Sequence, residues 1–77
     1  KAYLNYHRDT NELNVYFNAF CESVLVNITD ISGKKILTKC FENSQNISLL
    51  IPFNQVSGVY IVSLNYDGKK QIEKLIL

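Results

Sequence analysis

The fold of this chain is decided by a stretch near its end, Gly58-Val59-Tyr60-Ile61-Val62-Ser63-Leu64, followed by Tyr66-Asp67-Gly68-Lys69. The first part is almost continuously apolar, which is typical of a central strand covered on both faces. Asp67-Gly68 between two strand-like runs favours the tight type I′ turn of a hairpin. The sequence therefore predicts a hairpin whose second strand runs from Lys70 to Leu77.

Period-two alternation of apolar and polar residues continues through the rest of the chain, as half-buried strands require. Between two such segments lies Asp30-Ile31-Ser32-Gly33. We expect a turn there, because Asp30 can bond the backbone two residues on and Gly33 can take positive φ. The predicted strands are Ala2–Tyr6, Glu12–Asn18, Ser23–Asp30, Lys34–Phe41, Ile47–Ile51, Val59–Leu64 and Lys70–Leu77.

Three local features of these strands carry their own expectations. Pro52 is expected to stop the fifth strand, since proline cannot donate to a ladder. Phe53 and Val56 are expected to plug one end of the fold. In the last strand, Ile72 and Leu75 cannot face the same side unless a bulge lies between them.

Seven short strands, frequent turn signals and no helical pattern predict an all-β fold, a seven-stranded antiparallel immunoglobulin-like β-sandwich. The alternative is a six-stranded barrel, which is less favoured because several strands are too short to tilt and close. Residues 1–77 are expected to form a single domain, since a chain of 77 residues allows one and no more.

Composition supports a folded domain and excludes several classes of function. Hydrophobic residues make up 47% of the chain and charged residues 19%, which excludes the disordered, highly charged class. A net charge of +1 gives no field that would attract nucleic acid or an anionic membrane. No apolar run approaches the roughly 18 residues of a membrane span. We therefore expect no nucleic-acid partner and no membrane-spanning segment.

No combination of residues predicts catalysis, a cofactor or a metal site. His7 is the only histidine, and it lies in a polar segment with Asp9 and Glu12, an arrangement that is usually solvated surface. The carboxylates lie mostly in turns and at strand ends, so no acid–base pair in a cleft is expected. The sequence therefore predicts a protein that is not an enzyme.

Cys21 and Cys40 leave three interpretations open. If the strands reverse near Ser32, Cys40 lies opposite a residue close to Ser23 or Leu25, and Cys21 falls out of register with it. The pair is then two buried thiols, a disulfide made possible by a bulge, or a nucleophile with no histidine beside it.

The tyrosines leave a further choice. In a sandwich they are more often the edges of the core than an exposed surface that binds carbohydrate or peptide. The five are Tyr3, Tyr6, Tyr16, Tyr60 and Tyr66.

Three motifs in order along the chain resemble one known family. They are Asp30-Ile31-Ser32-Gly33-Lys34-Lys35-Ile36, Gly58-Val59-Tyr60-Ile61-Val62 and Glu73-Lys74-Leu75-Ile76-Leu77. Over about residues 12–77 this order resembles the C-terminal sorting domain of proteins that Gram-negative bacteria export through the type IX secretion system. That family shows a turn D-x-[ST/N]-G-[KR]-x-[VI], a strand G-[VI]-Y-x-[VI] and a final strand K-[VI]-[IVL]-[VL].

The resemblance implies a non-catalytic domain that directs a covalently preceding cargo across the outer membrane and is recognised by proteins of the translocon. It implies that the protein is secreted or held at the cell surface after passing through the periplasm. Unpaired edges at the terminal strands would also allow a homodimer. The resemblance assigns a signal or recognition role to Gly58, Val59, Tyr60, Lys74, Leu75, Ile76 and Leu77, beside the turn residues Asp30, Gly33, Asp67 and Gly68.

Two features depart from that family. Tyr3-Leu4-Asn5-Tyr6 stands where many members carry Pro-Asn-Pro, and the two cysteines are atypical. Both suit a second resemblance, to small secreted bacterial immunoglobulin-like domains, which predicts a binding or adhesion module as the alternative function. The turn motif and the terminal strand favour the sorting domain, whereas an exposed tyrosine cluster would favour the binding module.

Overall fold

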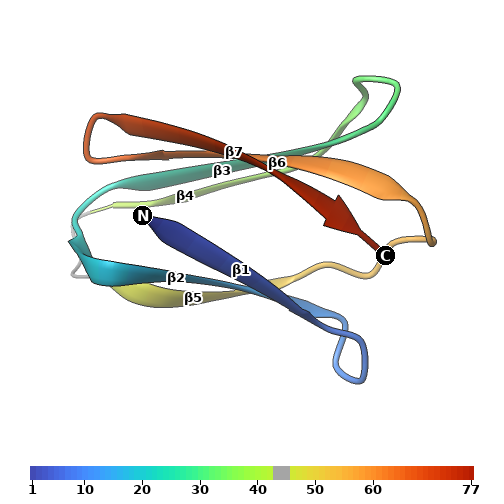
Figure 1. Ribbon diagram of the computed structural model, residues 1–77, viewed down its shortest axis with the longest axis horizontal. Helices are drawn as coiled ribbons and strands as arrows, with labels where there is room; N and C mark the ends of the chain where they lie inside the picture. The colour runs from blue at the N-terminus through green and yellow to red at the C-terminus, as the bar shows by residue number, and fades with distance from the viewer. Residues whose placement is uncertain (43–45) are drawn as a thin grey trace.

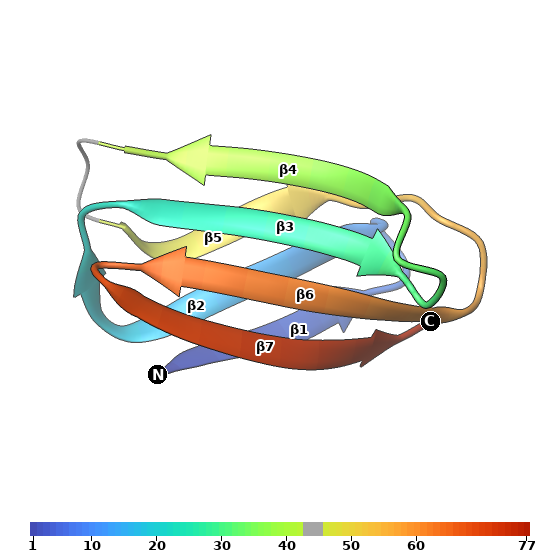
Figure 2. The ribbon, with the colours of Figure 1, turned by 90° about the horizontal axis from the view of Figure 1, so that it is seen from above.

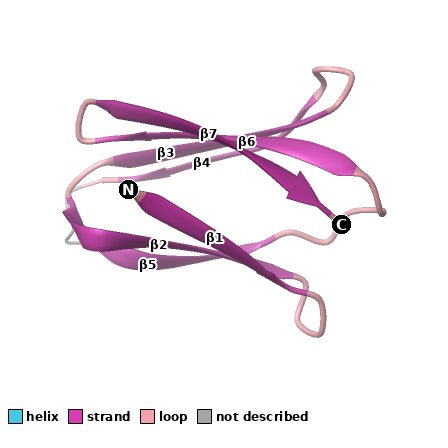
Figure 3. Cartoon of the chain, viewed as in Figure 1, coloured by secondary structure: helices cyan, strands magenta, loops and turns pink. Residues whose placement is uncertain are grey.

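The computed structural model of the chain describes residues 1–42 and 46–77, apart from the side chains at positions 19, 20, 46 and 47. Within these ranges strands are joined by loops and turns, without a helix (Figure 3). The strands are β1 (Ala2–His7), β2 (Glu12–Cys21), β3 (Val24–Asp30), β4 (Lys35–Phe41), β5 (Asn46–Pro52), β6 (Val59–Tyr66) and β7 (Lys69–Ile76). The largest difference from the predicted bounds is in β2, which runs to Cys21 and not to Asn18.

The strands form two sheets that face each other as a sandwich (Figure 1). One sheet has the order β1-β2-β5 and the other the order β4-β3-β6-β7, which Figure 2 shows from above. Every pairing is antiparallel. The predicted all-β sandwich is confirmed, and the six-stranded barrel is wrong because the two sheets stay separate.

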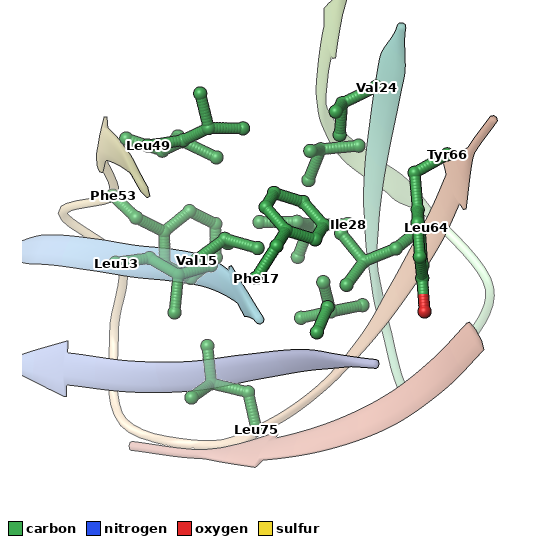
Figure 4. Packing of buried hydrophobic residues seen from close by; sticks show 14 of the residues in the cluster. Leu13, Val15, Phe17, Val24, Ile28, Leu49, Phe53, Leu64, Tyr66 and Leu75 are labelled. Atoms are coloured by element: carbon green, nitrogen blue, oxygen red, sulfur yellow. The ribbon is translucent and has the colours of Figure 1, made fainter. Parts of the chain in front are cut away.

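The core lies between the two sheets, because alternate residues of each strand point to the inner face. Figure 4 shows side chains of β2, such as Val15 and Phe17, meeting side chains of β3 and β6, such as Ile28 and Leu64. Among the described side chains no polar or charged residue is buried, so apolar contact holds the sheets together. The buried residues are Ala2, Leu13, Val15, Phe17, Cys21, Val24, Val26, Ile28, Leu49, Ile51, Phe53, Tyr60, Val62, Leu64, Tyr66 and Leu75.

Strand β6 is central in its sheet, between β3 and β7, but it is covered on one face only. Its residues alternate between half-buried and buried. Outward residues such as Val59 and Ile61 are shielded only by their neighbours in the sheet. The predicted coverage of both faces is therefore wrong, because a two-layer sandwich places its second layer on one side.

Strand β7 is regular, although its sequence is not. It pairs with β6 in an unbroken register. Leu75 points into the core, whereas Ile72 points outward and is 59% exposed. No bulge is needed, because the two residues lie on opposite faces.

The fifth strand ends at Pro52, as predicted, with Pro52 itself as the last residue of β5. The strand tolerates proline because β5 is an edge of its sheet, where a missing N–H leaves no ladder bond unmade. Phe53 is buried as predicted, but Val56 is 79% exposed and does not plug the sandwich. A loop side chain needs a neighbouring strand to cover it, and local hydrophobicity does not report one.

The turn at Asp30 has the predicted chemistry. Its carboxylate accepts hydrogen bonds from the Ser32 hydroxyl at 2.6 Å and from the backbone N–H groups of Ser32 and Lys34, both at 2.9 Å. Gly33 has a φ of 91°. Glycine is favoured there because L side chains rarely adopt this conformation.

The hairpin turn also forms as predicted, with φ of 48° at Asp67 and 79° at Gly68. Asp67 does more than turn the chain. Its carboxylate accepts hydrogen bonds from the backbone N–H of Glu22 at 3.2 Å and of Ser23 at 3.1 Å. The tip of the β6–β7 hairpin is thereby fixed to the connection between β2 and β3. Asp67 therefore has a tertiary contact in addition to its predicted role in the turn.

The Asp30 turn predicts a pH dependence of stability. The hydrogen bonds from the Ser32 hydroxyl and from the Lys34 N–H hold the pKa of Asp30 below its ordinary value of 3.8. A lowered folded-state pKa means that the ionised carboxylate stabilises the fold above pH 3.8. This stabilisation is lost as the pH falls through the lower value. We expect Asp30→Asn to be less stable than wild type at neutral pH and equally stable in acid.

Urea unfolding over a pH series measures this difference. Ser32→Ala removes one of the hydrogen bonds and should show a smaller gap of the same sign. A stability difference between Asp30→Asn and wild type that stays constant down to strong acid would contradict the prediction.

Candidate functional site in the last two strands

The two segments to which the resemblance assigns a signal role lie side by side in the structure. Val59 of β6 is opposite Ile76 of β7. Gly58 and Leu77 lengthen this ladder by one pair, because Gly58 N–H donates to Leu77 C=O at 3.2 Å and Leu77 N–H donates to Gly58 C=O at 2.9 Å. Two motifs that are separate in the sequence are therefore one continuous surface at the end of the sandwich.

This paired segment has a core face and a solvent face. Tyr60 and Leu75 are opposite each other and both point inward, where they are buried. Lys74 and Ile76 point outward beside Val59, and Ile76 is 63% exposed. The residues of one motif thus divide into those that hold the strands in place and those that a partner can touch.

Tyr60 anchors the loop that leads into β6. Its hydroxyl donates to the C=O of Val56 at 2.7 Å, and its ring meets the edge of Phe53 at a centroid distance of 5.3 Å. Phe53 in turn packs edge-on against Tyr6, whose hydroxyl donates to the Phe53 C=O at 2.8 Å. This aromatic cluster fixes the chain immediately before Gly58, and edge-to-face geometry is the favourable arrangement for such rings.

Backbone geometry does not require glycine at position 58. Its φ lies outside the left-handed region, and a Cβ placed there would have Tyr60 Cε2 as its nearest neighbour at 3.9 Å, an ordinary contact distance. Gly58 contributes to the β6–β7 ladder through its backbone hydrogen bonds to Leu77, which do not depend on its missing side chain.

Gln71 joins the two sheets at the opposite end of β7. Its side-chain amide accepts a hydrogen bond from the Ala2 N–H at 3.0 Å and donates one to the Ala2 C=O at 2.8 Å. The Tyr66 hydroxyl donates to the same amide oxygen at 2.9 Å, and the amide nitrogen donates to Glu73. Gln71 is not among the residues predicted from the sequence. Its position two and four residues before the inward-facing residues Glu73 and Leu75 was the available signal.

A cleft of about 320 Å³ lies beside this contact, between β1 and β7. Figure 1 shows the two strands next to each other at the open side of the sandwich. Two lysines and one glutamate give the cleft a positive balance. It is lined by Lys1, Ala2, Tyr3, Leu4, Tyr16, Glu73, Lys74 and Leu75.

The cysteines are not joined to each other. Cys40 lies opposite Leu25, as predicted, but it is exposed, whereas Cys21 is buried on the other sheet. The buried-thiol interpretation is therefore right for Cys21 and wrong for Cys40, and the disulfide is wrong. Burial raises the pKa of Cys21, and the Glu42 carboxylate, which accepts from the Cys40 thiol, raises the pKa of Cys40. Both shifts reduce the thiolate fraction, which disfavours a nucleophile.

The tyrosines divide between the two predicted roles. Tyr60 and Tyr66 are buried, and Tyr6 is half-buried. Tyr3 and Tyr16 are 45% and 40% exposed and stack on the outer face of the smaller sheet, with ring centroids 5.7 Å apart.

Other chemistry in the described ranges is sparse. His7 is the last residue of β1 and lies opposite Glu12. Across residues 1–42 and 46–77, no three side chains of His, Cys, Asp or Glu come together as metal ligands. The same residues contain no helix with the length and hydrophobicity that a bilayer span requires.

These features define an all-β sandwich domain whose distinctive residues meet in its last two strands. The family model described as "Secretion system C-terminal sorting domain" matches residues 9–77, and the chain belongs to this family. The resemblance seen in the sequence is thereby confirmed. No curated protein matches the chain.

Membership states what the domain does. It is a C-terminal sorting signal of type IX secretion, so it is attached to a cargo and handled by the secretion machinery. Proteins that carry such a domain are exported to the cell surface or secreted.

The matched range leaves out β1, which is nevertheless integral to the sandwich. β1 pairs with β2 along its whole length, from Ala2 opposite Phe17 to His7 opposite Glu12. Ala2 is buried in the core and bonded to Gln71.

The Tyr60 contacts predict a purely structural role for its hydroxyl. Tyr60→Phe removes the hydrogen bond to Val56 and should lower the free energy of unfolding by about 1 kcal/mol. Tyr66→Phe removes a hydroxyl of the same strand outside the motif and is the matched control. We expect both variants to be exported with the same efficiency as wild type. Export is measured as the exported fraction of a reporter fused in front of the domain. Loss of export for Tyr60→Phe alone would contradict this prediction and show that the secretion machinery recognises the hydroxyl itself.

Proposed function

We propose that the solvent face of the paired segment, formed by Val59, Lys74 and Ile76, is the surface that the secretion machinery reads. Tyr60 and Leu75 hold that surface in place from the core side. In this proposal the domain has no catalytic role of its own. Residues 1–77 act as one domain, because β1 completes the smaller sheet and contributes Ala2 to the core.

The observation that carries this proposal is the register of β6 and β7. It brings both family motifs into one ladder and leaves their alternate residues outside. Ile76 is 63% exposed on an edge strand. Exposed apolar side chains on an edge are a hazard that folded proteins normally limit, so their presence there favours a binding role.

Deleting residues 74–77 is not a clean test of this idea. The deletion removes Leu75 from the core and the Leu77 hydrogen bonds to Gly58, so loss of export could result from unfolding alone. Substitutions that change only outward side chains separate recognition from stability.

We expect Lys74→Glu/Ile76→Thr to abolish export of a reporter fused in front of the domain, while its thermal unfolding stays close to that of wild type. Both side chains point to solvent, so surface substitutions there should change stability by no more than about 0.5 kcal/mol. The matched control is Lys39→Glu/Ile31→Thr, which makes the same changes at exposed positions of β4 and of the Asp30 turn.

Export is scored by the fraction of reporter found outside the cell or on its surface. Normal export of the Lys74→Glu/Ile76→Thr variant would refute the proposed surface. An equal loss of export in the control would show that charge or general surface character, and not this face, is being sensed.

The exposed pair Tyr3–Tyr16 favours a second candidate function, a binding module that uses the outer face of the smaller sheet. Stacked rings offer an apolar surface on which sugars or peptides bind, and Asn5 and Asn14 lie opposite each other in the next row of the same strands.

Tyrosine fluorescence tests this second candidate, because the chain has no tryptophan whose emission would mask a ligand bound at Tyr3 and Tyr16. We expect quenching by a soluble cell-surface polysaccharide in wild type and not in Tyr3→Ala/Tyr16→Ala. Equal responses in the two proteins would dismiss this candidate.

A further inference from the structure

We propose that the free edge of β7 binds an extended segment of a partner protein as an additional strand, and that this segment alternates acidic and apolar side chains. The inference rests on the proposed function, because β7 carries half of the surface that is read. It adds the mode of recognition and the chemistry of the partner.

The backbone of β7 is open on the side away from β6. The exchange of two hydrogen bonds between Leu77 and Gly58 fixes which residues of β7 bond to β6. In an antiparallel pair such bonded positions alternate along the strand. The backbone N–H and C=O groups of the odd-numbered residues of β7 therefore point toward β6. The N–H and C=O groups of the even-numbered residues face the free edge, where no side chain or loop of the described chain bonds to them. These residues are Lys70, Ile72, Lys74 and Ile76.

The side chains of the same four residues form a regular row on the solvent face. Lysine and isoleucine alternate along it, and Ile72 and Ile76 are 59% and 63% exposed. An added strand would place its own outward side chains directly opposite, because cross-strand neighbours interact in pairs. Acidic residues opposite Lys70 and Lys74, and apolar residues opposite the isoleucines, complement this row.

The other exposed edge next to it is already blocked. Gln71 exchanges two hydrogen bonds with the Ala2 backbone, as a residue of a neighbouring strand would do. Its amide therefore occupies the place where an incoming strand would begin to pair with β1. The edge of β7 has no such cover, and strand addition to an uncovered edge is an established mode of peptide recognition.

Charge argues for a separate partner and against a second copy of this chain. The edge strands β1, β4 and β5 contain no acidic residue, and β4 contributes Lys35 and Lys39. The remaining edge strand, β7 itself, has Glu73, whose side chain points inward and accepts from Gln71. No edge of a second copy thus offers the acidic side chains that Lys70 and Lys74 would meet.

Hydrogen exchange of the isolated chain tests the inference directly. The probe is a capped synthetic peptide in which Glu and Val alternate at every second position, with Thr between them. We expect it to slow amide exchange at Ile72 and Lys74 by about tenfold or more, because their N–H groups face the free edge. Exchange at Gln71 and Glu73 should not change, since their N–H groups already bond to β6. A peptide with Lys in place of Glu is the charge control and should protect neither pair.

Two variants at one position isolate the backbone contribution. Ile72→Pro removes an N–H that faces the free edge without removing a bond to β6, and it should abolish protection at Lys74. Ile72→Val keeps the N–H and should retain protection. If Ile72→Pro proved unfolded, the wild-type exchange pattern with the two peptides would still decide the matter.

The proposal is overturned by the absence of protection, by equal protection with the lysine peptide, or by protection without any peptide in a sample that light scattering shows to be dimeric. The last result would identify a second copy as the occupant. In cells, normal export of Ile72→Pro together with failed export of Lys74→Glu/Ile76→Thr would refute strand addition and leave the proposed function standing. Normal export of both would refute both.

Discussion

Burial of the two inner faces against each other is the constraint on which the rest of this structure depends. With 77 residues there is material for one apolar layer and no more, and that layer consists of alternate residues of the strands. Alternation then fixes the surface as firmly as the core. Because Leu75 must point inward, Lys74 and Ile76 must point outward. The same rule that folds the domain therefore leaves alternate residues of the family motifs exposed to solvent.

Much of this fold could be predicted, because its main signals are local. Alternation located most of the strands and nearly continuous hydrophobicity located β6, while the residues Asp30, Gly33, Asp67 and Gly68 gave the turns through their own backbone preferences. What failed involved contacts between distant segments. Three features depend on which element lies across from a residue. They are the exposure of Val56, the single covered face of β6 and the separation of Cys21 from Cys40. The hydrogen bonds of Asp67 to Glu22 and Ser23 were also not predicted, because they join segments that are distant in the sequence.

The candidate site shows the same division. The resemblance that these motifs gave is confirmed by the family match over residues 9–77, and the signal role of the individual residues stays a prediction. Their pairing across β6 and β7 required the register, and their division into a buried and an exposed set required the direction of each side chain. Gln71 was missed because glutamine on a strand gives no signal by itself. Its role comes from Ala2, which lies 69 residues away in the sequence.

The contact between Gln71 and Ala2 has a mechanical consequence. A force applied at Lys1 does not act on β1 alone, because both backbone groups of Ala2 are tied to a side chain of β7. Tension on a preceding cargo would therefore be transmitted across the sandwich to the strand that carries the sorting motif. The strand β7 is itself held at both ends, by the Asp67 carboxylate bonded to the Ser23 N–H at the hairpin tip and by the Gly58–Leu77 hydrogen bonds at its other end. Through the two hydrogen bonds between Ala2 and Gln71, a force on the first strand would also act on the last strand.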